Sequence, residues 1–387
     1  MKNFVVNIIF PVLLYCLSQS LTAQTVIVKL AIIGDYGRYS IPEIRVSNMV
    51  HSWNPDFIIT LGDNNYEFGA DSTIDSNIGQ CYHDFIYPYS GIFGQGSAIN
   101  KFFPCMGNHD WISDSAHPYL NYFTLPGNER YYDYVKGNIH FFSIDSDINE
   151  PDGYTLNSVQ ARWLQNNLAA STSTFNIVYF HHPPYSSGQH GNSPDLQWPF
   201  KEWGATVVLN GHDHDYERIY YDDFTYFVNG IGGKEARPFS TIFPGSVFRY
   251  TGGFGAQLIT SYQDSINFRF YGLGDSLIDN YTISAPPIGI LNQTETAAEF
   301  SLSQNYPNPF NPSTKIHFNV PPGKTMRNIS ITVYNVLGEQ ISSLLNQQMN
   351  PGGFEVEWNA LKYPSGIYFY KLESETFSET KQMVLIK

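Results

Sequence analysis

The feature that most constrains this chain is a set of five short apolar runs. Each run is followed at once by Gly, Asp, Asn or His. Their length and their content of Val, Ile, Leu or Phe are typical of buried strands. They occupy residues 26–33, 56–61, 102–106, 175–180 and 206–209. In open α/β sheets, ligands bind beyond the carboxyl ends of the strands. The sequence therefore predicts an α/β fold in which five strand ends converge on one site.

The residues that follow these strands are of the types that hold metal ions. Carboxylate, amide and imidazole groups are common metal ligands in proteins. The candidates are Asp35, Asp63, Asn108, His181, His212 and His214. A glycine before most of them lets the backbone turn sharply and approach an ion closely. Ordinary strand-to-loop turns also favour Gly, Asp and Asn, but five such ends in series favour a metal site.

These motifs resemble the signature of the metallophosphoesterases. The matching segments are Asp35-x-Gly37, Gly62-Asp63-x-x-Tyr66, Gly107-Asn108-His109-Asp110, Val178-x-x-His181 and Gly211-His212-x-His214. The tyrosine of the second motif points to the purple acid phosphatase branch of this family. The resemblance covers roughly residues 25–283. It implies an α/β fold in which a metallophosphoesterase β-sandwich is flanked by helices, giving four layers.

The resemblance also implies a dinuclear centre of Fe(III) and a divalent metal (Zn, Fe or Mn). It assigns Asp35, Tyr66 and His214 to the ferric site. It assigns Asn108, His181 and His212 to the divalent site, with Asp63 bridging the two metals. Phenolate and carboxylate ligands suit Fe(III), whereas imidazoles and an amide oxygen suit Zn(II), Fe(II) or Mn(II). If Tyr66 is not a ligand, the alternative is a manganese or zinc phosphoesterase without the ferric centre.

Further histidines flank the predicted ligands. His181 and His182 are adjacent, and the spacing from Val178 selects His181 as the ligand, which leaves His182 as a packed neighbour. The resemblance assigns His109 and His190 to phosphate binding and to proton donation to the leaving oxygen. An imidazole must be protonated to donate, which favours activity on the acid side. A solvated loop histidine is the alternative for His190.

The predicted chemistry is metal-assisted transfer of a phosphoryl group to water. A metal-bound hydroxide attacks in line while both metals hold the phosphoryl oxygens. The two carboxylates and the phenolate carry less charge than Fe(III) and a divalent ion together. The centre can therefore hold a phosphate although the chain has a formal net charge of −14 at pH 7. This acidic balance, without a basic cluster, argues against nucleic acid as a partner.

The chain is long enough for more than one domain, and its N-terminus carries a targeting signal. Residues 1–23 have the pattern of a secretory signal peptide, with Lys2 before an apolar stretch and small residues up to Ala23. Residues 24–283 form the predicted catalytic domain and residues 284–299 a linker. Residues 300–387 alternate in short runs, which predicts a small β-sandwich. No other apolar run is long enough to span a bilayer.

The last of these domains resembles a type A sorting domain of the type IX secretion system. The matching segments are residues 305–312, 334–338, 365–372 and 381–387. The resemblance implies that the secretion machinery is a partner and that the chain passes the outer membrane, to be secreted or attached to the cell surface. An immunoglobulin-like accessory module or a carbohydrate-binding module is the alternative, although the domain lacks an obvious aromatic platform for a ligand.

Removal of the signal peptide leaves two cysteines, Cys81 and Cys105. Export makes a disulfide possible. Its geometry cannot be read from sequence, so a disulfide and two separate buried thiols both stay open. A catalytic role for either thiol is not expected.

The sequence as a whole predicts a secreted acid phosphatase that hydrolyses small-molecule phosphate monoesters. A phosphodiesterase or a nucleotide pyrophosphatase with the same metals is the alternative among enzymes. Loops such as residues 71–89 and 111–122 would set that choice, and the motifs do not describe them. A non-catalytic surface adhesin on the same fold is the alternative from another class. The complete set of predicted ligands argues against the adhesin.

Overall fold

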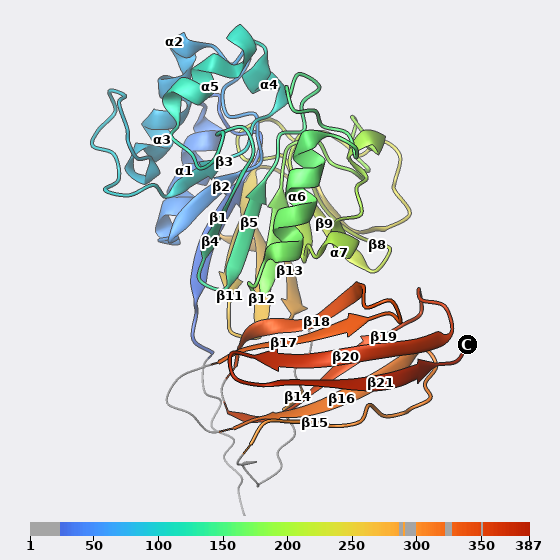
Figure 1. Cartoon of the computed structure of the whole chain (residues 1–387). Coiled ribbons are helices and arrows are strands. Elements are labelled where there is room, and N and C mark those ends of the chain that lie inside the picture. Colours follow the sequence, from blue (N-terminus) through green and yellow to red (C-terminus); the bar gives the residue numbers. More distant parts are fainter. Residues whose placement is uncertain (1–23, 286–288, 291–298, 322–326, 350) are drawn as a thin grey trace, which may run out of the picture.

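The computed structural model describes residues 24–285, 289–290, 299–321, 327–349 and 351–387. The predicted signal peptide and most of the predicted linker lie outside these residues. Figure 1 shows two separate β-rich bodies along the chain, one with helices on its outside and one built of strands. The first contains the strand ends that the sequence singles out.

One sheet of the first body has six strands and is assembled from distant parts of the chain. In spatial order it contains β13 (Ser276–Ser284), β12 (Ser265–Gly272), β11 (Gly255–Ser261), β1 (Val28–Ile33), β2 (Phe57–Thr60) and β3 (Phe102–Pro104). The neighbours β1, β2 and β3 are parallel, whereas β11, β12 and β13 pair antiparallel. Since β1, β2 and β3 run the same way, their carboxyl ends meet at one edge.

The second sheet has seven strands and supplies the other strand ends. In spatial order it contains β10 (Ser246–Tyr250), β8 (Tyr216–Tyr221), β9 (Phe224–Asn229), β7 (Val207–Asn210), β6 (Phe175–Tyr179), β5 (Ile139–Ser143) and β4 (Tyr132–Lys136). The strands β5, β6, β7 and β9 are mutually parallel. The predicted strand positions therefore agree with β1, β2, β3, β6 and β7 to within about two residues at each end.

The two sheets share one core because their strands alternate between two buried faces. Phe141, Ile177 and Leu209 point into the core that also contains residues of β1 and β11, whereas Phe142 and Val178 point to the opposite face. Successive side chains of a strand lie on opposite faces of a sheet. Strands buried on both faces read as nearly continuous apolar runs, which explains why these strands could be recognised from sequence.

Helices cover the two outer faces and complete four layers. The helix α1 (Ile41–Ser52) begins at Ser40, whose Oγ accepts a hydrogen bond from the Glu43 N–H at 3.3 Å, and packs its buried face against the six-stranded sheet. The helices α6 (Val159–Ala170) and α7 (Phe200–Trp203) pack against the seven-stranded sheet. The predicted four-layer α/β architecture is thereby confirmed.

Short helices surround the sheet edge where the parallel strands end. They are α2 (Asp71–Ile74), α3 (Gln80–Tyr82), α4 (Asn108–Trp111), α5 (His117–Tyr122), a π-helical turn (Asp75–Gly79) and 3₁₀ turns (His83–Phe85, Asp114–Ala116 and Pro194–Leu196). Figure 1 shows α2, α4 and α5 at the end of the sheets that is far from the C-terminal strands.

The C-terminal body is a sandwich of two four-stranded sheets. One contains β14 (Gly289–Ile290), β19 (Gly352–Asn359), β16 (Ser313–Val320) and β15 (Ser301–Leu302). The other contains β18 (Gln340–Met349), β17 (Arg327–Tyr334), β20 (Gly366–Ser374) and β21 (Ser378–Leu385). Residues such as Ile316, Ile331 and Tyr370 form a core of its own between the sheets. The expected all-β region is thus present.

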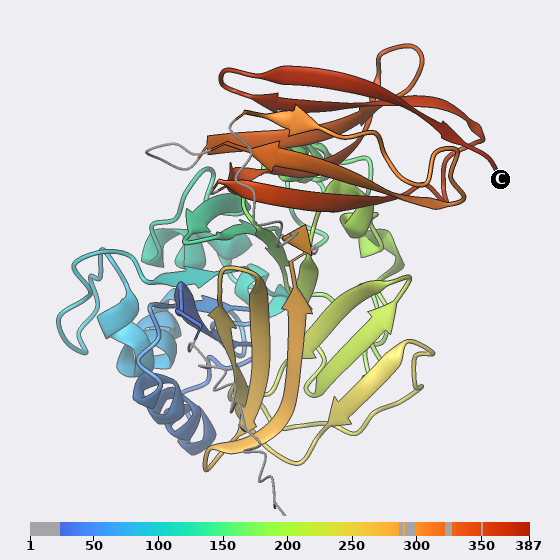
Figure 2. The ribbon, with the colours of Figure 1, turned by 90° about the horizontal axis from the view of Figure 1, so that it is seen from below.

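The C-terminal sandwich lies away from helices α1, α2 and α3 in both views (Figures 1 and 2). Lys362 of the sandwich forms an ion pair with Glu202 of α7, with Nζ 2.7 Å from Oε1. Both side chains are largely exposed, and an exposed pair of this kind contributes little to stability. The C-terminal sandwich lies at the end of the sheets opposite to the edge where the predicted ligands are found (Figure 1).

The two cysteines of the described chain are free thiols. Burial raises the pKa of the Cys105 thiol well above its ordinary value, and burial together with Glu43 raises the pKa of Cys81 to about 12. Protonated thiols are poor nucleophiles. Of the two possibilities left open by the sequence, the structure has the two separate thiols.

Candidate active site

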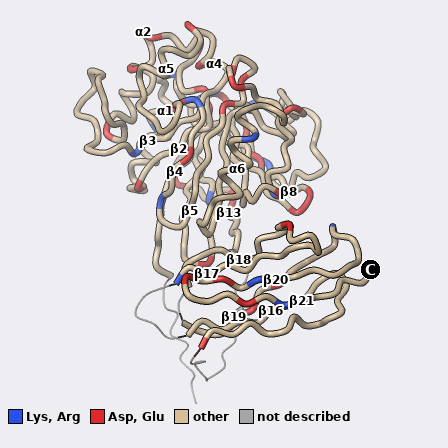
Figure 3. The backbone as a smooth tube through the Cα atoms, in the orientation of Figure 1, with Lys and Arg blue, Asp and Glu red and all other residues tan. Residues whose placement is uncertain are grey.

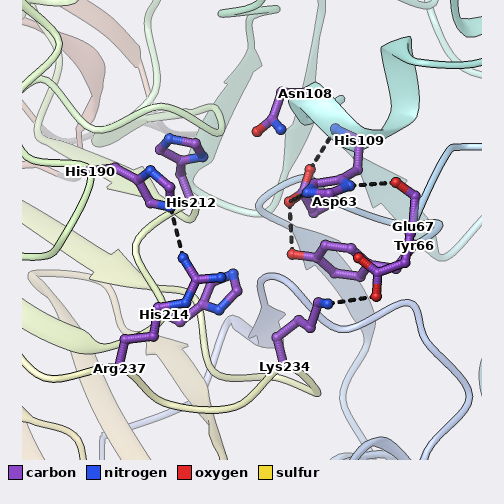
Figure 4. Close-up of a pocket in the computed structure, with 10 residues that line it drawn as sticks. All are labelled: Asp63, Tyr66, Glu67, Asn108, His109, His190, His212, His214, Lys234 and Arg237. Carbon is purple, nitrogen blue, oxygen red and sulfur yellow. Dashed lines mark hydrogen bonds and ion pairs between the residues drawn. The ribbon is translucent and has the colours of Figure 1, made fainter.

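A pocket of about 140 Å³ opens at the edge where both sheets present their strand ends (Figure 4). It is lined by Asp63, Tyr66, Glu67, Asn108, His109, His190, His212, His214, Lys234 and Arg237. Two of the predicted ligands, Asp35 and His181, lie beneath these residues and are fully buried. The structure therefore brings all seven predicted ligands and both predicted phosphate-contacting histidines to one site.

Each sheet contributes to this site through the loops that follow its parallel strands. Asp35 follows β1, Asp63 follows β2, and Asn108 begins α4 directly after β3. His181 follows β6, and the His212 loop follows β7. Because the two sheets pack face to face, neither sheet holds the full set alone.

Three of the predicted ligands adopt a left-handed backbone conformation. The φ angles of Asp35, Asp63 and His212 are 52°, 53° and 71°. This region is uncommon for residues other than glycine, and residues held there cluster at functional sites because the surrounding structure must compensate the strain. These turns let the chain reverse immediately after a strand and direct the side chains back toward one point.

Glycines beside the ligands permit a very close approach of the loops. Gly62 has a φ of 87°, and a Cβ at this position would fall 2.5 Å from His181 Nδ1. A Cβ at Gly211 would fall 2.7 Å from Asp35 Oδ2. No side chain larger than hydrogen fits at these points without moving a predicted ligand.

The hydrogen bonds of His181 leave one ring nitrogen available as a ligand. Its Nδ1 lies 2.7 Å from the carbonyl oxygen of Leu61, which can only accept, so Nδ1 carries the proton. Its Nε2 then bears a lone pair, and it faces Asn108 Oδ1 at 3.1 Å. Two acceptors at this distance have no proton to share. The pair fits a cation between them, and a backbone carbonyl that orients a ligating histidine is the usual arrangement in metal sites.

The electrostatics of the neighbouring groups also fit bound cations. Burial lowers the pKa of His181, and burial with the adjacent histidines lowers the pKa of His212 well below its ordinary value. Both rings are therefore neutral, the form that binds metals. Burial and then Asp63 raise the pKa of Asp35, because two carboxylates without a counter-charge repel each other.

Tyr66 lies among the carboxylates and not in the apolar core. Its hydroxyl donates to Asp63 Oδ2 at 2.7 Å and lies 3.1 Å from Asp35 Oδ1. Burial, and then Asp35 and Asp63, raise the pKa of Tyr66 well above its ordinary value. The phenolate form therefore requires a cation beside it. His214 completes this side, with its Nε2 3.5 Å from Asp35 Oδ1.

The two predicted phosphate-contacting histidines stand on opposite sides of the pocket (Figure 4). The backbone N–H of His109 donates to Asp63 Oδ1 at 3.0 Å, and its Nδ1 lies 2.6 Å from the carbonyl oxygen of Glu67. The ring of His190 lies 4.2 Å from the ring of His212 and is largely exposed to the pocket mouth. Both imidazoles can therefore meet a phosphate held between them.

His182 is packed against the rings of the predicted ligands. Its ring centroid lies 4.4 Å from that of His212, and its Nδ1 lies 2.9 Å from Ser146 Oγ. Burial lowers the pKa of His182 to about 3, so the ring is neutral. The nitrogens of His181, His182 and His212 form one cluster that could hold a cation, beside a second cluster of Asp35, Asp63 and His181.

A buried carboxylate between two predicted ligands anchors the loop that carries His190. Asp213 accepts the backbone N–H of His190 at 2.8 Å and the hydroxyl of Ser186 at 2.5 Å. Glu217 holds the same loop by accepting two hydrogen bonds from Ser187. Sequence reasoning missed these anchors, since nothing local indicates that residues 213 and 190 meet.

Three charged residues of the pocket were also missed by sequence reasoning. Glu67 follows Tyr66, whereas Lys234 and Arg237 belong to the loop after β9. The only sequence signal for that loop is the run Gly230-Ile231-Gly232-Gly233 before Lys234. A Cβ at Gly233 would fall 2.3 Å from the carbonyl oxygen of Tyr36, so the loop lies directly on the one that carries Asp35.

Comparison with known proteins gives two family matches along the chain. Residues 28–216 match the calcineurin-like phosphoesterases, and residues 304–387 match the secretion system C-terminal sorting domain. The sorting domain implies export through type IX secretion, to a secreted or cell-surface location. Among the residues that the structure describes, no helix is both long and apolar enough to cross a membrane.

Individual relatives match over the first body of the chain. Purple acid phosphatase 17 of Arabidopsis thaliana is 25% identical over 248 residues, which are 54% of this chain and 70% of that protein. Tartrate-resistant acid phosphatase type 5 of Oryctolagus cuniculus is 24% identical over 216 residues, 49% of this chain and 64% of that protein.

Solved structures show the same fold at lower identity. Purple acid phosphatase PPD1 from yellow lupin (Lupinus luteus) seeds has a TM-score of 0.55 and 18% identity, covering 66% of this chain and 53% of that one. GAP50, described as the anchor in the inner membrane complex of Plasmodium, has a TM-score of 0.50 and 19% identity, covering 67% and 88%. Residues 28–216 thus match the calcineurin-like phosphoesterases, which supports a hydrolase of phosphate esters similar to the purple acid phosphatases, and the chain ends in a secretion sorting domain.

Proposed function

We propose that the chain is an exported acid phosphatase that hydrolyses phosphate monoesters with two bound metal ions, Fe(III) and a divalent metal. The observation that carries the proposal is the pair of acceptors His181 Nε2 and Asn108 Oδ1, 3.1 Å apart beside the carboxylate of Asp63. A cation among these atoms would satisfy both acceptors. The acid phosphatases among the matching relatives support the same reaction.

The contacts between the predicted ligands support two neighbouring metal positions. Tyr66 and His214 both contact Asp35, and these three residues would hold Fe(III). Asn108 and His212 both contact His181, and these three residues would hold the divalent ion. Asp63 touches members of both groups and would bridge them. When bound, such a pair of ions polarises the phosphoryl oxygens and activates a water.

The residues of the chain itself bind and orient the substrate. The backbone N–H of His109 fixes one oxygen of Asp63, which keeps this carboxylate in its bridging orientation. The rings of His109 and His190 face the pocket from opposite sides, so they would hold the phosphoryl oxygens between them. His190 would give a proton to the leaving oxygen, which requires an imidazolium and therefore favours acid pH. Its Nε2 accepts a hydrogen bond from Arg237 Nη1 at 3.0 Å, so this bond would have to break before Nε2 carries the proton.

The test uses the purified chain loaded with iron and zinc, with the metal content measured. Hydrolysis of an aryl phosphate monoester and of the matching diester is followed from acid to alkaline pH. We expect turnover of the monoester with a maximum on the acid side. A preference for the diester would shift the function to diester or nucleotide cleavage. Absence of turnover with both metals bound would favour a non-catalytic surface role.

Asp63→Asn is the matched negative control for this assay. It removes one negative charge and one ligand oxygen while it keeps the size of the side chain. We expect hydrolysis to fall by at least about 100-fold, since even residues outside the ligand set of a metal site cost about 10- to 100-fold. Metal analysis of the variant should show loss of at least one ion. Full activity with both metals retained would contradict the bridging role.

A further inference from the structure

Arg237 is a positively charged residue of the pocket for which the described part of the chain provides no acidic partner. Its Nη1 donates to His190 Nε2 at 3.0 Å, and among the described residues this is the only hydrogen bond of its guanidinium. The chain has 35 acidic and 21 basic side chains, and Figure 3 shows acidic residues along the whole backbone. An uncompensated guanidinium in such a chain is available for an anion that comes from outside.

The other cations near the pocket are already neutralised. Lys234 Nζ lies 2.7 Å from Glu67 Oε1 and 4.3 Å from the ring centroid of Tyr66. Arg38 lies 3.7 Å from Glu67 and 3.4 Å from Glu235. Their positive charges are balanced by these carboxylates. Arg237 differs from them because no carboxylate of the described residues pairs with it, and the N–H donors other than the one directed at His190 stay available.

The position of Arg237 is built into the fold. Its backbone N–H donates to the carbonyl oxygen of His214 at 2.7 Å, and the N–H of Lys234 donates to the carbonyl oxygen of Asp35 at 2.9 Å. The loop is therefore attached at two points to the backbone of predicted metal ligands. A side chain held in this way loses less conformational entropy on binding than one on a free loop.

The direction of the guanidinium indicates which part of a substrate it would meet. Figure 4 shows Arg237 and His190 together on one side of the pocket, with Tyr66 and Glu67 on the other. In the proposed function His190 faces the leaving oxygen. A group just beyond that oxygen would therefore reach the remaining N–H donors of Arg237.

We propose that Arg237 binds an anionic group on the leaving side of the substrate. The preferred substrates are then phosphate esters or anhydrides that carry a second phosphate or a carboxylate a few bonds beyond the scissile oxygen. Guanidinium presents five N–H donors, and its planar fork matches the paired oxygens of both anions. This inference rests on the proposed function, because it extends the substrate class of the same pocket.

The test compares a neutral and two anionic leaving groups in the metal-loaded full chain. Glycerol 2-phosphate, 2-phosphoglycerate and pyrophosphate are hydrolysed by the wild type and by Arg237→Gln. We expect kcat/KM of an anionic substrate to fall about 10- to 100-fold more than that of glycerol 2-phosphate, the range for a hydrogen bond to a charged group. A loss through His190 falls alike on glycerol 2-phosphate and 2-phosphoglycerate, since both leaving groups are alkoxides, and cancels in their ratio. Pyrophosphate releases phosphate, which needs less protonation, so a loss through His190 would be smaller on pyrophosphate and could not produce a larger loss there.

The two anionic substrates separate the two anion types. A selective loss on pyrophosphate alone assigns a phosphate to Arg237, and a selective loss on 2-phosphoglycerate alone assigns a carboxylate. Equal losses on all three substrates would overturn the inference and leave Arg237 as a positioning residue for His190. Arg237→Lys keeps the charge but loses the fork, and we expect it to recover only part of the preference.

Arg38→Gln is the matched control, because it removes a cation near the mouth that is already paired with carboxylates. We expect the ratio between anionic and neutral substrates to change less than about twofold. A shift as large as that of Arg237→Gln would mean that net charge alone sets the preference, which would overturn the specific role of Arg237.

A binding measurement keeps this inference separate from the proposed function. Titration calorimetry with methylenediphosphonate and methylphosphonate needs no turnover. We expect Arg237→Gln to lower the affinity for methylenediphosphonate at least about 10-fold more than the affinity for methylphosphonate. A protein that hydrolyses none of the esters but shows this selective loss would disprove the proposed function and retain the anion site. If the binding of both phosphonates weakened equally, the proposed anion site would be disproved, whether or not the protein hydrolyses the esters.

Discussion

The oxygen of Tyr66 decides between two kinds of metal centre. It lies 3.1 Å from Asp35 Oδ1 and 2.7 Å from Asp63 Oδ2, within the set of predicted ferric ligands. If it binds Fe(III) as phenolate, the oxidised protein absorbs broadly in the visible. We expect Tyr66→Phe to lose this absorption while the protein keeps its iron, as measured by a visible spectrum with metal analysis.

Tyr36→Phe is the control for this experiment. Tyr36 is also fully buried, next to Asp35 in sequence, but its hydroxyl donates to Asn64 Oδ1 at 3.1 Å and not to a predicted ligand. The colour should therefore persist in this variant. A colourless wild type with iron bound would falsify the ferric tyrosinate and favour a manganese or zinc phosphoesterase instead.

At the scale of elements, the loop with His190 depends on Asp213. We expect Asp213→Ala to lower kcat about 10- to 100-fold, because the loop loses two hydrogen bonds to a buried carboxylate and small misplacements of a catalytic group are costly. The measurement is steady-state kinetics at constant metal content, and KM should change less than kcat.

Asp213→Asn tests the anchoring role directly. An amide keeps one acceptor oxygen for the N–H of His190, so we expect it to stay within about tenfold of the wild type. A wild-type kcat in Asp213→Ala would show that the loop is held by other contacts, such as those of Ser187 with Glu217.

The first turn of α1 contains a buried carboxyl group with a consequence for stability. Burial raises the pKa of Glu43 from 4.5 to about 8. The folded state therefore keeps a proton that the unfolded chain releases above pH 4.5, and stability falls between pH 4.5 and pH 8. We expect Glu43→Gln to be more stable than the wild type at pH 8 by a few kcal/mol, at about 1.4 kcal/mol per pKa unit.

Urea unfolding at pH 5 and pH 8 measures this difference. The increase in the free energy of unfolding that Glu43→Gln causes should be small at pH 5 and should grow toward pH 8. Asp275→Asn, an exposed carboxylate between β12 and β13, is the control and should show no such growth. A constant difference across this interval would contradict a raised pKa at Glu43.

At the scale of the whole molecule, the C-terminal sandwich has its own core and lies away from the pocket (Figure 1). We expect a chain that ends near residue 299 to keep kcat/KM within about twofold of the full chain, because a body with a separate core can be removed without repacking the other. The same truncation should abolish export in a cell with type IX secretion, followed by immunoblotting of the medium and the cell surface. Loss of catalysis would mean that contacts such as Lys362 with Glu202 support the first body.

The sequence alone determined the strands and the ligand-bearing turns of the first body. Strands buried on both faces are continuous apolar runs. Four of the five turns after them combine a glycine with Asp, Asn or His, and the fifth begins with His181 and His182. The family resemblance then paired Asp35, Tyr66 and the other candidates with metals. These features depend on residues that are neighbours along the chain, so they can be read without coordinates.

Only the tertiary structure decided how the pocket is completed. Asp213 meets the loop of His190, and Arg237 reaches the same histidine from the loop after β9, through contacts between segments that are distant in sequence. The left-handed turns at Asp35, Asp63 and His212 likewise depend on the loops packed against them. Among the described residues Arg237 has no acidic partner, because the fold brings the nearby carboxylates to Lys234 and Arg38, and no local pattern encodes that.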